Sequence, residues 1–391
     1  MTKKTSLDAE ISALVTLFQQ GQFNAVEQRV RTLLASNPKA AMAWKILGTV
    51  LMQQGQSEEA LAALHQAAQL TPKDAELYYN QGMIYKNLGQ LEIARDSYQE
   101  ALRIQPNFVE AWNNLGTTLR ALGLYAEAID SLTRAVQLRP NFLLAHNNLG
   151  GALRNAGRLE EAASCYRQLL KLKPDYAEAH HNLGIILRDL KRFDEAVRCF
   201  QRALKLNQSY AEAENNLGIT LEQGLSRSDQ AVEHYRKALE LKPQFPEALN
   251  NLGTSLQNLG HIEEAIDCYR GALKFRPFYP EACRNLSLLH TFRENDPLLA
   301  TMAEQLASCP ATGDDRIQLD FALAKAYEDI GAIGSCMERL AEGNRLRKEQ
   351  LGYTINSDRQ LFCRIKELFS PSPAPFDLAA DSSRVKPVFI L

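Results

Sequence analysis

The chain of 391 residues repeats itself at an interval of 34 residues, and this period constrains the fold more than any other feature. Prolines mark this interval in most of the units. In the sixth unit Gln208 stands in the proline position, and the seventh unit is one residue longer than the others. The proline row contains Pro38, Pro72, Pro106, Pro140, Pro174, Pro243 and Pro277. A unit of this length cannot bury its apolar face alone, so neighbouring units have to stack.

Rows of small and aromatic residues follow the same period. The glycine row contains Gly48, Gly82, Gly116, Gly150, Gly184, Gly218 and Gly253. The alanine row contains Ala60, Ala94, Ala128, Ala162, Ala196, Ala231 and Ala265. Aromatic residues follow several of these alanines, at Tyr98, Tyr166, Phe200, Tyr235 and Tyr269. We expect the small residues to let two helices approach closely while the aromatic rings fill the space beside them.

A second set of glycines predicts where the first helix of each unit ends. This turn row contains Gly21, Gly55, Gly89, Gly123, Gly157 and Gly260. Glycine is favoured there because a helix C-terminus often needs a left-handed residue, and the proline then ends the second helix. Glutamates recur in the first turn of the first helix, at Glu76, Glu110, Glu178, Glu212, Glu247 and Glu281. We interpret them as complements to the helix dipole.

The segment from Ala111-Trp-Asn-Asn-Leu-Gly116 to Pro140 resembles a tetratricopeptide repeat (TPR), a helix-turn-helix unit. After a tail at residues 1–6, eight units occupy residues 7–279 and degenerate helical pairs occupy 280–350. The first unit departs from the pattern, with Leu14 in the glycine row and Val26 in the alanine row. The seventh has its insertion near residues 225–228, where we expect an irregularity. The resemblance implies an all-α fold, a right-handed superhelical solenoid whose first helices line the concave face.

Composition excludes several classes of protein. Forty-four Lys and Arg against 46 Asp and Glu give a formal charge of −2, so there is no overall electrostatic footprint for nucleic acid or anionic membrane. We find no secretory h-region near the start and no apolar run long enough for a transmembrane helix. Seven cysteines without a C-x-x-C pair fit neither a disulfide framework nor a zinc site. These features predict a reduced, cytoplasmic protein.

Asparagine occupies one position of the first helix in seven consecutive units: Asn80, Asn114, Asn148, Asn182, Asn216, Asn251 and Asn285. Each costs roughly 0.6 kcal/mol of helix propensity against Ala, so the row as a whole needs an offset. One interpretation is that the amides bridge adjacent units. The other is a ladder that grips an extended peptide, since an amide both donates and accepts. A similar ladder lines the superhelix of the O-linked N-acetylglucosamine transferase family. Alone it would bind weakly and without specificity.

A basic row flanks the asparagines, with members Lys86, Arg120, Arg154 and Arg188. It favours acidic peptide side chains or a carboxylate in the groove. The alternative is a solvated helix end that prefers cations because of its dipole. Both rows together form the predicted peptide-binding site.

Histidines and cysteines suggest no catalytic or metal site. His146 and His180 share one position with Trp44, Tyr78 and Trp112, which favours packing over metal binding. The second-helix cysteines, Cys165, Cys199 and Cys268, also share one position and are expected to be small core residues rather than nucleophiles.

The repeat weakens after Pro280. The sequence predicts a helix through Ser308, a helical pair over 315–330 and 335–350, and a further helix within 351–369. Residues 331–335 contain two glycines but read as a helix-helix turn, not as a phosphate loop. Residues 370–387 form a Pro-rich and polar linker, and 388–391 read as a lone β-type strand.

This C-terminal arrangement resembles bacterial TPR-linked sulfotransferases, on residues 321–331, 342–347 and 351–353 and the terminal 387–391. In that family the strand continues into a Gly-x-Pro-Arg-Ser-Gly-Thr loop, which binds the phosphosulfate donor. No such loop occurs here, so no catalytic, cofactor-binding or metal-binding residue carries over. The resemblance implies the non-catalytic, substrate-recruiting part of such an enzyme. In that case residues 388–391 would be the first strand of a missing sulfotransferase domain.

The expected partner is a protein or an extended peptide in the groove, without nucleic acid or membrane and with self-association possible. A free-standing adaptor or assembly factor is the alternative, as is the superhelix of a protein similar to O-linked N-acetylglucosamine transferase. A complete enzyme with its active site in residues 300–391 is a third, less favoured interpretation.

Overall fold

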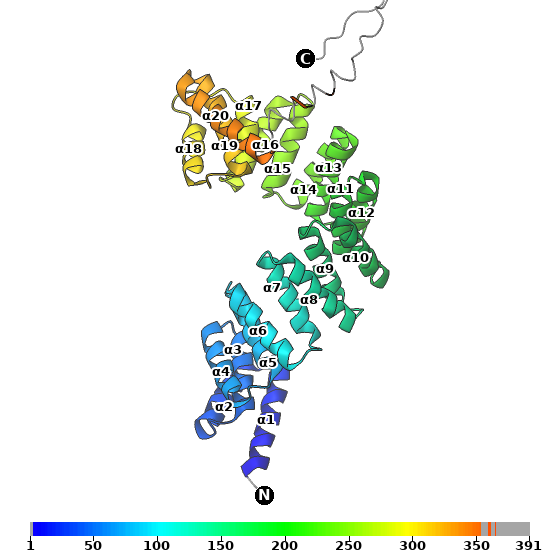
Figure 1. Ribbon diagram of the computed structural model, residues 1–391, viewed down its shortest axis with the longest axis vertical. Coiled ribbons are helices and arrows are strands. Elements are labelled where there is room, and N and C mark those ends of the chain that lie inside the picture. Colours follow the sequence, from blue (N-terminus) through cyan, green and yellow to red (C-terminus); the bar gives the residue numbers. More distant parts are fainter. Residues whose placement is uncertain (1–2, 353–358, 361–363, 365–391) are drawn as a thin grey trace, which may run out of the picture. The chain divides into compact units, whose positions relative to one another are not determined.

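The computed structural model describes residues 3–352, 359–360 and 364, and its 20 bounded elements are all α-helices (Figure 1). The all-α fold expected from the period is therefore confirmed. The chain divides into two parts, Met1–Leu241 and Lys242–Leu391. We treat each part by itself. The linker over 370–387 and the strand over 388–391 lie outside the described residues, as does most of the predicted 351–369 helix.

The first part contains seven helix pairs. Their bounds are α1 Lys3–Gln19, α2 Phe23–Ser36, α3 Ala41–Gln53, α4 Ser57–Leu70, α5 Ala75–Asn87, α6 Leu91–Ile104, α7 Val109–Ala121, α8 Tyr125–Leu138, α9 Leu143–Asn155, α10 Leu159–Leu172, α11 Ala177–Asp189, α12 Phe193–Leu206, α13 Ala211–Leu225 and α14 Ser228–Leu241. Helix α1 begins at Lys3, so residues 3–6 belong to it and not to a tail. The other pairs follow the 34-residue units.

The glycine row sets how closely the two helices of a pair approach. A Cβ on Gly150 would lie 2.4 Å from the Tyr166 ring, and one on Gly82 would lie 2.7 Å from Tyr98. Real Cβ atoms do not come so close, so only glycine permits the observed contact. The rings themselves are buried against the partner helix, with Tyr98 0% and Tyr166 3% exposed. The expected pairing of small residues with aromatic rings is confirmed.

The turn row adopts the left-handed conformation that it predicts. Its six glycines have φ between 73° and 85°. In the sixth unit Lys191 takes the same conformation with φ 62°, although no glycine marks the place. In the seventh unit Ser226 has φ 53° and ends α13. The irregularity expected at the insertion is therefore present, and a non-glycine residue carries it at a small steric cost.

The aromatic position of each first helix ties the unit to the preceding turn. Trp44 and Trp112 donate their indole N–H to the carbonyls of Pro38 and Pro106, each at 2.9 Å. The Nε2 atom of His146 lies 2.8 Å from the carbonyl of Pro140 in the same way. His180 repeats the contact, at 3.0 Å from the carbonyl of Pro174. The two histidines therefore have the packing role that the sequence indicates.

The second part continues the pairs and then departs from them. Its helices are α15 Pro246–Asn258, α16 Ile262–Phe275, α17 Pro280–Leu289, α18 Pro297–Ser308, α19 Asp314–Asp329 and α20 Ile333–Gln350. Gly331, with φ 74°, turns α19 into α20, so the expected helix-helix turn is present, but it covers residues 330–332 and residues 333–335 already belong to α20. Asp320 is fully buried and pairs with Arg339 at 3.0 Å, which fixes α19 against α20. Burial raises the pKa of Asp320 despite the two arginines near it.

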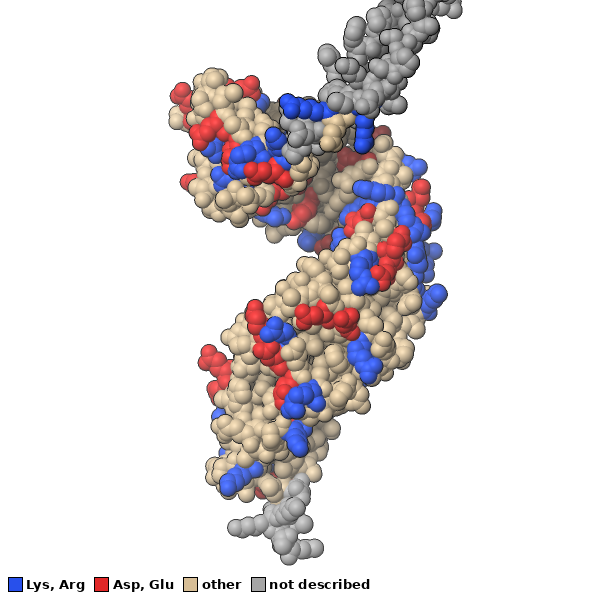
Figure 2. All heavy atoms as spheres, viewed as in Figure 1, with Lys and Arg blue, Asp and Glu red and all other residues tan. Residues whose placement is uncertain are grey.

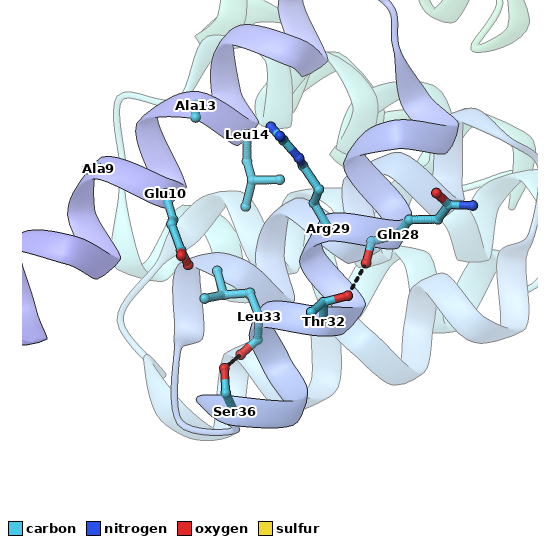
Figure 3. Close-up of a pocket in the computed structure, with 9 residues that line it drawn as sticks. All are labelled: Ala9, Glu10, Ala13, Leu14, Gln28, Arg29, Thr32, Leu33 and Ser36. Atoms are coloured by element: carbon cyan, nitrogen blue, oxygen red, sulfur yellow. Dashed lines mark hydrogen bonds between the residues drawn. The ribbon is translucent and has the colours of Figure 1, made fainter.

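The first pair is more open than the others. Leu14 replaces the glycine, and α1 and α2 approach each other less closely than the helices of the six later pairs of the first part. A cleft of about 780 Å³ lies on this pair, between Ala13 and Leu14 on α1 and Leu33 on α2 (Figure 3). Three units later, Leu115 and Asp130 take the places of Ala13 and Gln28 and border α6. The cleft therefore corresponds to the face on which, in a later pair, the second helix of the preceding unit packs.

Candidate functional site

The first helices of neighbouring units pack against one another, as α5 does on α7, α7 on α9 and α11 on α13. They form a continuous surface of the first part, which we call the inner face. The asparagine row and the basic row both lie on these helices. On the side of the molecule visible in Figure 2, basic and acidic side chains lie in scattered small groups between larger areas of other residues.

The asparagine amides bridge successive units. Asn114 donates from Nδ2 to the Tyr79 hydroxyl at 3.1 Å. Asn148 donates to Asn113 Oδ1 at 2.9 Å, and each partner lies 35 residues earlier. Asn182 continues the series, donating to Asn147 Oδ1 at 3.1 Å. The bridging role that the sequence left open is therefore present, and it helps to offset the low helix propensity of the row.

The acceptors of these bonds form a row that the sequence analysis did not single out. They lie one residue before each asparagine, at Tyr79, Asn113, Asn147 and His181. The Asn-Asn doublets at 113–114 and 147–148 were the available signal. Because the doublets recur at the repeat interval, they could have predicted a donor and an acceptor on neighbouring units.

His181 replaces asparagine in this acceptor row and keeps the bond. Its Nε2 lies 3.0 Å from Asn216 Nδ2, and its Nδ1 lies 3.1 Å from the Tyr210 hydroxyl. Since the amide can only donate, Nε2 must be unprotonated, which assigns a neutral ring with its proton on Nδ1. Burial lowers the pKa of His181 and favours this neutral form.

A cavity of about 460 Å³ opens on the inner face over α7, α9 and α11. Asn148 and Asn182 both line it, together with Arg120 and Arg154. Members of both predicted rows therefore meet in one cavity, although their spacing along a single helix does not place them side by side. Leu144 adds an apolar side chain that is 50% exposed.

The amide oxygens are the part of the asparagine row that remains available to a ligand. Asn114 Oδ1 accepts from Asn113, and Asn216 Oδ1 accepts from Arg188 at 2.8 Å. Within the described part of the chain, the Oδ1 atom of Asn148 accepts no hydrogen bond, whereas the Asn182 side chain has a hydrogen bond with His181. Both asparagines are partly exposed, so Asn148 Oδ1 can receive an N–H group of a bound chain, with Asn182 beside it.

Three members of the basic row are engaged by the next unit. Lys86 donates to the Thr117 hydroxyl at 2.7 Å. Arg154 pairs with Asp189 at 3.1 Å, and Arg188 donates to Asn216. Arg120 differs, because it makes no hydrogen bond or ion pair with any residue that the structure describes.

The glutamates of the first turn also connect units. Glu110 pairs with Arg139 at 2.8 Å, and Lys45 contacts Glu76 at 2.5 Å. Glu178 accepts from Asn147 at 3.1 Å. They all lie in the first helical turn, so the dipole interpretation stands. Glu76 and Glu178 also hold the preceding unit, whereas Glu110 pairs within its own unit.

Nothing on the described residues groups three His, Cys, Asp or Glu side chains as a metal site would. Cys165 donates its thiol to the His146 carbonyl at 3.3 Å, and burial raises the pKa of the Cys165 and Cys199 thiols to about 11. Thiols in that state are poor nucleophiles at neutral pH. No described helix has the length and hydrophobicity needed to cross a bilayer.

The last two members of the asparagine row lie in the second part of the chain. Asn285 donates to Asn250 Oδ1 at 3.1 Å, which repeats the bridge between units. Asn250 in turn donates to Glu281 at 3.2 Å. Asn80, at the other end of the row, has no hydrogen bond among the described side chains.

Family models support the repeat assignment directly. Models of the tetratricopeptide repeat match residues 79–141, 141–209, 175–244 and 234–267, and a TPR repeat model matches 48–89. Together they run without a gap from residue 48 to 267, more than half of the chain. The chain belongs to the TPR repeat family.

Solved structures agree on the fold. The APC/C hetero-tetramer Cut9–Hcn1 matches with a TM-score of 0.50 and 19% identity, over 73% of this chain and 56% of that one. YrrB, described as a TPR protein with an unusual peptide-binding site, is 26% identical over 47% of this chain and 95% of its own, with a TM-score of 0.43. MamA is 26% identical over 44% and 94%, with a TM-score of 0.41. No curated protein gives a significant match.

Proposed function

We propose that the chain is a scaffold that binds a protein segment in extended conformation on its inner face. The observation that carries this proposal is the cavity over α7, α9 and α11, which Asn148 and Asn182 both line and where Asn148 Oδ1 accepts no hydrogen bond from the described residues. An extended segment has backbone N–H groups without internal partners, so it can donate to this oxygen. The TPR repeat assignment agrees with a role in binding rather than catalysis.

The bridging bonds make the acceptors well placed. Each amide is fixed by its own donation to the first helix of the preceding unit, so it loses little side-chain freedom on binding. A net hydrogen bond is worth about 1 kcal/mol, so these amides supply orientation more than affinity. The exposed Leu144 side chain supplies apolar contact beside them.

The double variant Asn148→Ala plus Asn182→Ala tests the proposal. Twelve-residue peptides selected from a phage library against the native protein should bind the variant about tenfold or more weakly, as measured by fluorescence polarisation. Loss of two bridging bonds is partly offset by the better helix propensity of Ala, so the free energy of unfolding should fall by only about 1 kcal/mol.

A matched control replaces Asn107 and Asn141, which lie exposed in turns between units, by Ala. These changes should leave peptide affinity unaltered. If the groove variant loses several kcal/mol of stability while its affinity is unchanged, the asparagine row is purely structural. If the native protein selects no peptide at all, the binding proposal itself is wrong.

A narrower role is recruitment of substrate to a sulfotransferase, with the free-standing adaptor as the alternative. It rests on the sequence resemblance at residues 321–353, which form most of α19 and α20, and the matched models and structures above are repeat proteins only. We also propose a reduced, cytoplasmic setting, because the six described cysteines are free thiols. An assay with the phosphosulfate donor should show no turnover by this chain, and turnover would overturn the non-enzymatic role.

A further inference from the structure

The cavity on the inner face contains a cation without a counter-ion. Arg120 is half-buried, and it has no hydrogen-bond or ion-pair partner within residues 3–352. A guanidinium carries five donors in a fixed fork, and no donor of Arg120 is buried without a partner, so they are open to solvent and to a ligand in the cavity. The three other basic residues in the row each reach a side chain of the next unit, and Arg120 does not.

The reason lies in the residue that Arg120 meets. Lys86 reaches forward 31 residues to the Thr117 hydroxyl. The same step from Arg120 arrives at Gly151, which has no side chain to offer. The guanidinium lies directly over that glycine, since a Cβ there would be 2.4 Å from Arg120 Nη1. Besides this arginine, nothing lies within 4 Å of such a Cβ, so the glycine makes room for Arg120 alone.

The surrounding charges reinforce the effect. Lys86 has no ion pair among the described residues, and its pKa is lowered by burial and by the neighbouring charge of Arg120. Arg154 also lines the cavity, with its own charge compensated by Asp189. The acidic lining residue, Glu178, already accepts hydrogen bonds from Asn147 and Tyr176. These two donors are neutral, so Glu178 keeps its negative charge, and with Arg154 offset by Asp189 the remaining charges are Lys86, Arg120 and Glu178. They leave one net positive charge beside Arg120.

We propose that Gly151 and Arg120 form a specificity site that accepts the carboxylate of one Asp or Glu side chain in a bound extended peptide. The inference rests on the peptide-binding function proposed above and assigns to the cavity one position that selects a negatively charged side chain. Asn148 and Asn182 hold the backbone of the segment, and an acidic side chain between them reaches the guanidinium in the same cavity. A carboxylate matches the guanidinium fork in geometry and supplies the missing counter-charge.

The test compares peptide selection by three proteins: the native chain, Arg120→Gln and Gly151→Ala. Twelve-residue peptides displayed on phage should show Asp or Glu enriched at one fixed position against the native protein. For the best synthetic peptide, replacing that acid by its amide should weaken binding about tenfold or more in the native protein. In both variants the acid and amide peptides should bind equally.

Gly151→Ala separates this role from folding. Ala is the better helix former, and its Cβ would displace only the Arg120 guanidinium, so the melting temperature should stay the same or rise. Arg134→Gln, on the exposed face of α8, removes the same charge elsewhere and should keep the acidic preference. If both groove variants retain the preference, the specificity site is wrong.

Two further outcomes separate the possible failures. Selection of peptides without any acidic preference would overturn the Arg120 site and leave peptide binding standing. Failure to select any peptide would overturn both proposals. Each synthetic peptide is made with an amidated and with a free C-terminus, and a preference that appears only with the free C-terminal carboxylate would overturn the side-chain assignment.

Discussion

The first helix pair and the pairs that follow it reach their buried state by different means. In the later pairs a glycine on the first helix lets a Leu, Tyr or Phe of the second helix lie against the backbone. In the first pair Leu14 fills that place and is itself buried, at 3% exposed, and the two helices approach each other less closely. The comparison indicates that the glycine row lets a pair close tightly.

The largest effect is expected from the first pair. Leu14→Ala removes a buried side chain from a core that already has an open cleft, so it should cost about 3 kcal/mol of unfolding free energy. Hydrogen exchange should report the loss at the amides of α1 and α2. Equal exchange rates in the variant and the native protein would mean that Leu14 does not hold this pair together.

A smaller effect is expected in a regular pair. In Gly150→Ala the added Cβ meets Tyr166 at 2.4 Å, so the ring has to shift. Overpacking destabilises the pair, and the better helix propensity of Ala offsets part of that cost. The free energy of unfolding, measured by urea denaturation, should therefore fall by about 1–2 kcal/mol. Gly151→Ala, one residue further on the same helix, is the matched control and should cost nothing. Equal costs at both positions would contradict the role of the glycine row.

The smallest effect concerns pH. Because burial lowers the pKa of His181 from its ordinary value of 6.5, the unfolded chain takes up a proton first as the pH falls. Stability at this site should therefore decline below pH 6.5, until the lowered pKa of the folded state is reached. His181→Asn restores the residue found at 113 and 147 and should remove this part of the pH dependence. An unchanged slope of unfolding free energy between pH 7 and 5 would count against the neutral-histidine assignment.

The period predicted the helix pairs well because each row has a local physical meaning. A left-handed residue at Gly123 and a helix-ending proline at Pro140 act within a few residues of themselves. The same logic missed Lys191, because nothing in its side chain marks the left-handed conformation that the repeat imposes on it.

The site was predicted only in outline. The asparagine row was visible in the sequence, and so was the choice between bridging units and binding a peptide. In the structure bridging uses only the amide N–H group, so one asparagine side chain can serve both roles. The Nδ2 atom of Asn148 bridges to the preceding unit, while its Oδ1 remains available in the cavity. Sequence spacing could not separate the two atoms, because that depends on which way the amide faces.

The sequence alone determined the class of fold, the bounds of most helices and the two rows that carry the predicted site. These follow from chemistry that repeats with the period and acts between near neighbours in the chain. Only the tertiary structure decided which members of a row remain available. Arg120 and Arg154 look alike in the sequence, yet one meets Gly151 and the other Asp189 on the next unit. That difference arises because the partner of each side chain is set by stacking between units.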